Sequence, residues 1–297
     1  MSPKQIWRVI KSAVDEWNKD NAARLAAALA YYTIFSIAPL LILVIAIASL
    51  FFDSAAVRDQ LMAQIQSLVG VDGADFLRSV LDNANRPGEQ SGWVASAVSI
   101  GLLILGATGV LTQLQTALNV VWDVKVKPGM GFWAVIYKRV LSFGMVLGIG
   151  FILLVSLVLS AMVAGFSNYL HNVAPGLDSF SQVLSFVVSF GVTTLVFALI
   201  FKFVPDVKIS WGDVWFGGIV TALLFSLGKV LIGLYLGNSS FGSTYGAAGS
   251  VIILLVWVFY SAQILFFGAE LTQVYARRYG SKITPNDYAV KEYSSQP

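Results

Sequence analysis

Few residues in this sequence could do chemistry, and two of the ionisable ones lie in long apolar runs. Lys229 interrupts the run 214–236, and Glu270 closes the run 248–270. An ionisable side chain within an apolar segment long enough to cross a bilayer is a candidate for a functional site. Both residues are therefore candidates, and their surroundings predict different roles.

Lys229 lies on a helical face of small residues, because its neighbours recur at steps of three and four. The other members of that face are Gly218, Ala222, Ser226, Gly233 and Gly237. Two interpretations stay open. In one, Lys229 extends to the outer lipid headgroups. In the other, it faces a polar cavity and binds an anionic group, with Ser226 as a second substrate-binding candidate.

Glu270 shares a face with Tyr260, Gln263 and Phe267, of which the first two are further substrate-binding candidates. Lys229 and Glu270 are expected about 20 Å apart along the membrane normal, at 1.5 Å per residue, so they should not form a direct salt bridge. We favour a structural anchor over a transport role for Glu270. Its expected partners are Arg277, Arg278, Lys138 and Arg139.

A third set of candidates lies along the second apolar run, 93–114, and just beyond its end. These substrate-binding candidates are Thr108, Thr112, Gln115 and Asn119, which lie on one helical stripe. A polar stripe can line a wet cavity or pack in a tight bundle, and both interpretations stay open.

Other chemistry finds no support in the sequence. There is no Cys, and the single His171 lies in a short loop between apolar runs. The sequence contains neither a Walker A motif nor G-x-S-x-G, and no cluster of metal ligands. We therefore expect no enzymatic activity, no catalytic residue, no metal and no cofactor.

The composition explains where these candidates must sit. The chain of 297 residues is 57% hydrophobic and only 12% charged, against roughly a quarter charged in a typical soluble domain. Six apolar runs each reach the roughly 20 residues that a membrane-spanning helix needs. They are 31–52, 93–114, 140–165, 182–204, 214–236 and 248–270. The predicted fold is all-α, a polytopic domain over residues 22–275 with membrane lipids as its surroundings.

The Lys and Arg residues predict the orientation of these spans. Fifteen of them fall on one side and three in the 53–92 loop on the other, so both termini should be cytoplasmic. The basic loops then serve topology, and no nucleic-acid partner is expected. Pro39 should bend the first span. Residues 276–297 are expected to form a cytoplasmic tail.

Two extramembrane elements are also predicted. In residues 3–19, which belong to a separate segment 1–21, Ile6, Ile10, Val14 and Trp17 recur at helical spacing among basic residues. This pattern indicates a helix lying on the anionic cytoplasmic leaflet; a plain soluble helix is the alternative. The 53–92 loop should form an acidic two-helix lid on the outer side, either over a cavity or as a spacer.

Three stretches resemble the YihY/BrkB family of bacterial inner-membrane proteins. Residues 24–41 read RLAAALAYYTIFSIAPLL and residues 114–122 read LQTALNVVW. The third stretch combines YGAAGS at 245–250 with YSAQ at 260–263 and GAELT at 268–272. Together they cover most of the chain in the family's order.

The resemblance implies six helices in the bacterial inner membrane and a transporter or flippase of lipid or lipopolysaccharide-type amphiphiles. A non-transporting scaffold for envelope machinery is the alternative, and homo-oligomers stay open. The family's old label, ribonuclease BN, is not supported by these residues. Matching the motifs adds Tyr245 and Ser250 as binding candidates. It adds as structural or gating candidates Tyr31, Tyr32, Pro39, Gly246, Gly249 and Glu270.

Overall fold

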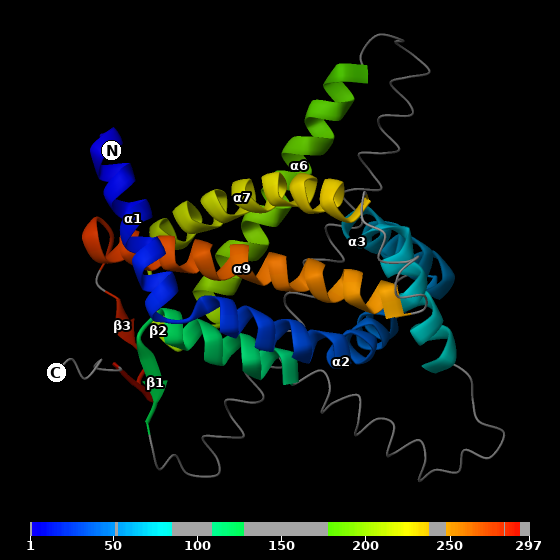
Figure 1. Cartoon of the computed structure of the whole chain (residues 1–297), viewed down its shortest axis with the longest axis horizontal. Coiled ribbons are helices and arrows are strands. Elements are labelled where there is room, and N and C mark those ends of the chain that lie inside the picture. Colours follow the sequence, from blue (N-terminus) through cyan, green and yellow to red (C-terminus); the bar gives the residue numbers. More distant parts are fainter. Residues whose placement is uncertain are drawn as a thin grey trace. The chain divides into compact units, whose positions relative to one another are not determined.

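The computed structural model describes residues 2–50, 53–84, 109–127, 178–237, 248–281 and 283–291, and these are mostly helical (Figure 1). The helices are α1 (Pro3–Lys19), α2 (Ala22–Ala48), α3 (Ser54–Ala84), α6 (Asp178–Phe203), α7 (Trp211–Gly237) and α9 (Gly249–Arg278). Residues 109–121 are also helical. The short strands are β1 (Val124–Val126), β2 (Val207–Lys208), β3 (Thr284–Pro285) and β4 (Ala289–Lys291).

Three of these helices are long and apolar enough to cross a membrane. They cover Val183–Phe203, Trp211–Tyr235 and Gly249–Arg278. The two parts of α2, Ala22–Ile37 and Pro39–Ala46, meet at 50° and pass the same test together. The bend falls at Pro39, as the missing amide hydrogen of proline predicts. Four of the six predicted spans thus overlap these helices, whereas 140–165 and most of 93–114 lie outside the described residues.

The chain divides into two compact units. The first unit comprises Met1–Trp17, Leu118–Ser226 and Phe267–Pro297, and the second comprises Asn18–Ala117 and Leu227–Phe266. Helices α7 and α9 each contribute residues to both units.

In the first unit, α7 and α9 pack through a reciprocal pair of glycines and threonines. A Cβ atom at Gly217 would lie 2.8 Å from the Cβ of Thr272, and one at Gly268 would lie 2.9 Å from the Cβ of Thr221. Each threonine hydroxyl donates to the glycine carbonyl four residues earlier in its own helix, at 2.7 Å for Thr221 and 2.6 Å for Thr272. The glycines therefore allow these two helices to approach closely, as small residues do in membrane helix pairs.

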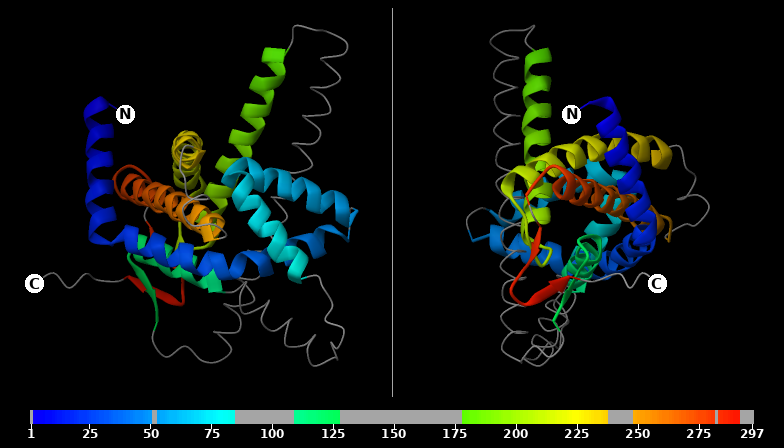
Figure 2. Two further views of the ribbon diagram at one scale, coloured as in Figure 1. Left: turned by 45° about the vertical axis from the view of Figure 1, so that its right-hand side comes forward. Right: turned by 90° about the vertical axis from the view of Figure 1, so that its left-hand side faces the viewer.

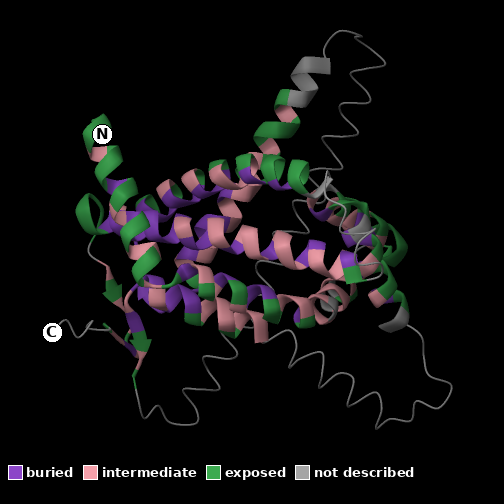
Figure 3. Ribbon diagram, in the orientation of Figure 1, coloured by how far each residue is buried: buried purple, intermediate pink, exposed green. Residues whose placement is uncertain are grey.

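Two further helices complete the core of this unit. Gly218 of α7 lies against the backbone of α6 at Thr194, and the rings of Phe197 and Phe225 are 5.6 Å apart between these helices. Helix α1 contributes the buried Val9 and Ala13 to a cluster with the end of α9. Much of the rest of α1 is exposed (Figure 3).

The first unit also contains strands, which the all-α prediction missed. Strand β1 pairs antiparallel with β4, and β2 pairs antiparallel with β3. The green β1 and the red C-terminal strands lie side by side in each view (Figure 2). Strands of two or three residues have too little periodicity to be visible in a sequence. Through these pairs, residues 284–291 of the predicted tail are part of the first unit.

In the second unit, α3 packs against α2 and the first half of α9. Gly70 breaks α3 with φ 81° and ψ 178°, so it consists of two helices, as predicted for this loop. Val69 and Leu77 are buried in one cluster with Ala30 of α2 and Leu254 of α9. The apolar faces of both α3 helices therefore form part of a core.

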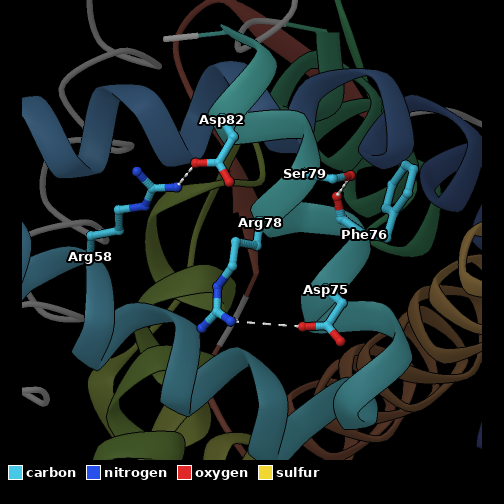
Figure 4. A network of polar contacts seen from close by, with 6 residues as sticks. All are labelled: Arg58, Asp75, Phe76, Arg78, Ser79 and Asp82. Carbon is cyan, nitrogen blue, oxygen red and sulfur yellow. Dashed lines mark hydrogen bonds and ion pairs between the residues drawn. The ribbon is translucent and has the colours of Figure 1, made fainter. Parts of the chain in front are cut away.

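Surface ion pairs of α3 involve both of its helices (Figure 4). Arg58 of the first helix pairs with Asp82 of the second, and Arg78 pairs with Asp75 at 3.8 Å within the second helix. Such exposed pairs contribute little stability, typically below about 1 kcal/mol. The buried apolar cluster is therefore the main source of stability for α3.

Candidate functional site

Asn119 and Asp206 are the centre of a buried polar network in the first unit. Asn119 lies in the last turn of the helix 109–121, and Asp206 lies in the bend after α6. Asn119 Nδ2 donates to Asp206 Oδ2 at 2.7 Å, and the Asp206 N–H donates to Asn119 Oδ1 at 2.8 Å. The Asp206 carbonyl also accepts from the Asn286 N–H at 2.9 Å. One buried pair therefore joins three segments that are far apart in the sequence.

Two side chains near the end of α9 bind Asp123, which lies just after the helix 109–121. The Gln273 amide donates to the Val121 carbonyl and, at 3.0 Å, to Asp123 Oδ2. Arg277, one turn later, forms an ion pair with the same carboxylate. Asp123 has φ 48°, a left-handed conformation that aspartate tolerates better than most residues. These contacts fix the chain where it leaves the helix and enters β1.

A third carboxylate joins the start of α7 to the end of α9. The Ser210 hydroxyl donates to Asp213 Oδ2 at 2.8 Å, and the Asp213 N–H donates back to Ser210 Oγ at 3.3 Å. This is helix capping at the N-terminus of α7. The Ser281 N–H and hydroxyl donate to the same Oδ2 at 3.1 and 2.7 Å. Ser210 therefore caps α7, and Asp213 binds both this cap and the chain just beyond α9.

Glu270 lies one turn before Gln273 in α9 and is fully buried. The arginines proposed as its partners have others: Arg277 pairs with Asp123, and Arg278 donates to Ser12 Oγ at 2.7 Å. Lys138 and Arg139 lie outside the described residues. The anchoring of Glu270 by Arg277 or Arg278 stays a prediction.

Asp287 is the charged group at the exposed edge of the network. Lys208 Nζ bonds to Asp287 Oδ1 at 2.8 Å, and Lys127 Nζ donates to the Asp287 carbonyl at 2.6 Å. The hydrogen bond and charge of Lys208 hold the pKa of the Asp287 carboxyl below its usual range, and the charge of Lys127 lowers it further. This contact fastens the turn between β3 and β4 to β2.

Chemically, the network offers carboxylates and amides in an apolar setting. Asp206, Asp213 and Glu270 are all buried. Within the described ranges, the buried Trp122 Nε1 and Gln273 Oε1 have no hydrogen-bond partner. No group of three or more His, Asp or Glu residues in these ranges could hold a metal ion. The arrangement is suited to hydrogen bonding within the protein and with a polar group.

The residues expected at a site occupy different surroundings. Asn119 and Glu270 are buried in the first unit, whereas Lys229 is exposed and belongs to the second unit. Two other residues of the polar stripe that contains Asn119 are less buried than Asn119: Thr112 is exposed and Gln115 is half-buried. Ser226 uses its hydroxyl to donate to the Ala222 carbonyl at 2.8 Å.

The family-motif residues of the second unit also differ in how far they are buried. Tyr31 and Tyr32 are exposed, with their rings edge to face at 5.9 Å. The Tyr260 ring lies against Gly228 of α7, where an added Cβ would be 3.0 Å from it. Gly249 is buried, and the half-buried residues are Pro39, Ser250, Tyr260 and Gln263. Thr108, Tyr245 and Gly246 lie outside the described residues. The substrate-binding assignments stay predictions.

Sequence reasoning missed three residues of the network. Asp206 carries no periodic signal, because it lies in a bend. Asp213 follows Ser210 by three positions, the spacing of a capping box, and that signal was available. Gln273 follows Glu270 by one helical turn on the same face, so extending that face by one turn would have included it.

Comparisons with known proteins agree with the sequence motifs. The family profile described as Virulence factor BrkB matches residues 13–291. The UPF0761 membrane protein of Alteromonas mediterranea is 30% identical over 255 residues, which are 86% of this chain and 83% of that protein. Its counterpart in Pseudoalteromonas translucida is 29% identical over 252 residues, 83% of this chain and 79% of that protein. The names of these relatives state no activity.

Other relatives are longer than this chain. The UPF0761 membrane protein of Rhodospirillum centenum is 29% identical over 284 residues, which are 93% of this chain but 59% of that protein. No solved structure matches the chain. The family match covers the helix 109–121, α9 and the strands that carry the polar network. The chain is therefore a membrane protein of the virulence factor BrkB family.

Proposed function

We propose that this protein moves an anionic amphiphile, of the lipid or lipopolysaccharide-precursor type, across the bacterial inner membrane. In this proposal six helices span the membrane and both termini are cytoplasmic. The observation that carries it is the full burial of Glu270 in α9, a helix long and apolar enough to cross a membrane. A carboxyl group at such a position is costly, and in membrane proteins it marks transport pathways and proton relays.

The surroundings of Glu270 support this interpretation. Gln273 is on the same face of α9, and its buried Oε1 atom is unsatisfied among the described residues. The buried indole Nε1 of Trp122, the residue that follows Val121 in the sequence, is also unsatisfied among the described residues. A buried donor and a buried acceptor favour binding of a polar group, because leaving them unpaired costs about 1–3 kcal/mol each. A headgroup that passes this region would supply such a group.

The energy source has to be something other than ATP hydrolysis by this chain, since the sequence contains no Walker A motif. The proposal therefore describes a passive scramblase or a carrier driven by an ion gradient. A buried carboxyl that can bind a proton is compatible with either mode.

The experiment is lipid scrambling in proteoliposomes. The purified protein is reconstituted with fluorescent anionic and zwitterionic lipids, and the fraction reduced by an impermeant quencher is followed with time. Wild-type protein should scramble an anionic lipid faster than protein-free liposomes. Glu270→Gln keeps the size of the side chain but replaces an ionisable carboxyl by a neutral amide. It should lower the rate about tenfold, equivalent to about 1.4 kcal/mol in the barrier.

The matched control is Asp75→Asn, which makes the same chemical change on the exposed surface of α3. It should retain the wild-type rate. Circular dichroism of all three proteins in detergent controls for folding. If wild-type protein scrambles several anionic lipids no faster than empty liposomes do, the transport proposal is wrong and a non-transporting scaffold becomes the better account.

A further inference from the structure

Helix α1 has a broad apolar surface, and one side of it is buried against other described residues. Successive residues of a helix are about 100° apart, so Val9 and Ala13 lie on one side. Both are buried, at 4% and 0% exposure. A neighbouring sector carries Ile6, Trp7 and Ile10, which are 47%, 67% and 37% exposed, and Val14, which is 40% exposed. Trp17, expected in the lipid-facing stripe, is half-buried instead.

The covered face attaches α1 to the end of α9. Val9 and Ala13 form a buried cluster with Leu271 and Val274 of α9. The contact is reinforced by Arg278 of α9, which donates to Ser12 Oγ of α1 at 2.7 Å. Helix α1 therefore packs on the last two turns of α9, beside the residues that hold Asp123.

This attachment places α1 close to a membrane surface. Helix α9 has 30 residues, a length of about 45 Å at 1.5 Å per residue. The hydrocarbon core of a bilayer is only about 30 Å thick. An apolar helix of this length that crosses the membrane must therefore reach the headgroup region, and its basic end at Arg277 and Arg278 is the end expected there.

The charges of α1 favour an anionic lipid surface as the occupant of the exposed face. Lys4, Arg8 and Lys11 are exposed and lie beside the apolar sector, and residues 3–14 contain no acid. Near the helix start, Pro3, Lys4, Trp7 and Arg8 line an open hollow of about 500 Å³. Basic residues attract lipid phosphates, and tryptophan favours the membrane interface.

We propose that α1 is seated on the anionic headgroups of the bilayer surface at the end of α9. Ile6, Trp7 and Ile10 enter the interface, and the three basic residues bind lipid phosphates. The adjacent face packs on α9, so α1 connects the lipid surface to the polar network. This inference does not rest on the proposed transport function, because lipid contact is measured without any transport.

Because the sequence contains no Cys, a spin label can be attached to a single introduced Cys. A spin label is attached to Ile10→Cys, in the exposed apolar sector, and in a second protein to Asp15→Cys, in the exposed polar sector. Each full-length protein is placed in nanodiscs that contain either 30% anionic lipid or zwitterionic lipid alone. The exposure of each label to lipid-soluble oxygen and to a water-soluble nickel chelate is then measured.

With anionic lipid, the oxygen-to-nickel exposure ratio at position 10 should exceed that at position 15 about fivefold or more, which is the factor given by about 1 kcal/mol, the contribution of a single basic residue near an anionic surface. Zwitterionic nanodiscs should reduce this difference. So should replacement of Lys4, Arg8 and Lys11 together by glutamine. Equal water exposure at both positions in both lipids would overturn the proposal. Spin–spin broadening at position 10 would also overturn it, because a second copy of the chain would then cover this face.

Discussion

Replacing Asn119 by alanine is expected to destabilise the first unit by about 3 kcal/mol. The buried side chain makes two hydrogen bonds with Asp206, at 2.7 and 2.8 Å. A bond to a charged carboxylate contributes roughly 2 kcal/mol, and one from a backbone amide roughly 1 kcal/mol. Alanine removes both while the carboxylate and the amide stay buried. The free energy of unfolding should therefore fall by the sum of both contributions, because water cannot replace the missing Asn119 side chain at this buried position.

The free energy of unfolding is measured by equilibrium denaturation of the purified protein in detergent. The matched control is Thr116→Ala, three residues earlier in the same helix. Its exposed hydroxyl donates to the Thr112 carbonyl at 2.8 Å, so its loss should cost less than about 0.5 kcal/mol. In a double-mutant cycle, Asn119→Ala and Asp206→Ala should couple by about 2 kcal/mol. Equal stabilities of the Asn119 and Thr116 variants, or a coupling near zero, would refute the reasoning.

Three further outcomes follow from the described contacts. Gly217→Ala should destabilise the protein by about 1–3 kcal/mol, because the added Cβ would overlap Thr272 of α9. Gly233→Ala should be tolerated, because its added Cβ meets nothing within 4 Å. Thermal unfolding in detergent compares the two variants. Gly70→Ala should cost about 1–3 kcal/mol through its backbone conformation alone, in the same assay. The Asp287 carboxyl, whose pKa Lys208 lowers, should stabilise the C-terminal strands above its usual titration range and lose this effect as the pH falls through its lowered pKa. A spin label in β4 should then become more mobile in acid, and Asp287→Asn should abolish that pH dependence.

The local elements of the chain could be predicted from the sequence because each depends on nearby residues. The runs 182–204, 214–236 and 248–270 predicted long apolar helices, and they overlap α6, α7 and α9 to within one residue of the run ends. The bend of α2 at Pro39 and the two helices of α3 also followed from local residues. Family membership was visible for the same reason, since three short motifs carry it. In each case the signal lies in contiguous residues of the element that it predicts.

The polar network could not be predicted from the sequence, because its contacts join residues that are far apart in the chain. Asn119 and Asp206 are separated by 87 positions, and Gln273 and Asp123 by 150. A stripe of polar residues on one helix says nothing about which of them a second helix will cover. The strand pairs β1–β4 and β2–β3 have the same character, since paired residues are at least 76 positions apart in the sequence.

The sequence by itself determined that this is a membrane protein of the virulence factor BrkB family, because apolar length and local motifs are properties of contiguous residues. Only the tertiary structure decided which polar residues act together. It buried Glu270 and Asn119 in the first unit, left Lys229 exposed, and divided the apolar residues of α1 between α9 and the surface. The physical reason is that burial depends on packing between distant segments, whereas helix formation and hydrophobicity do not.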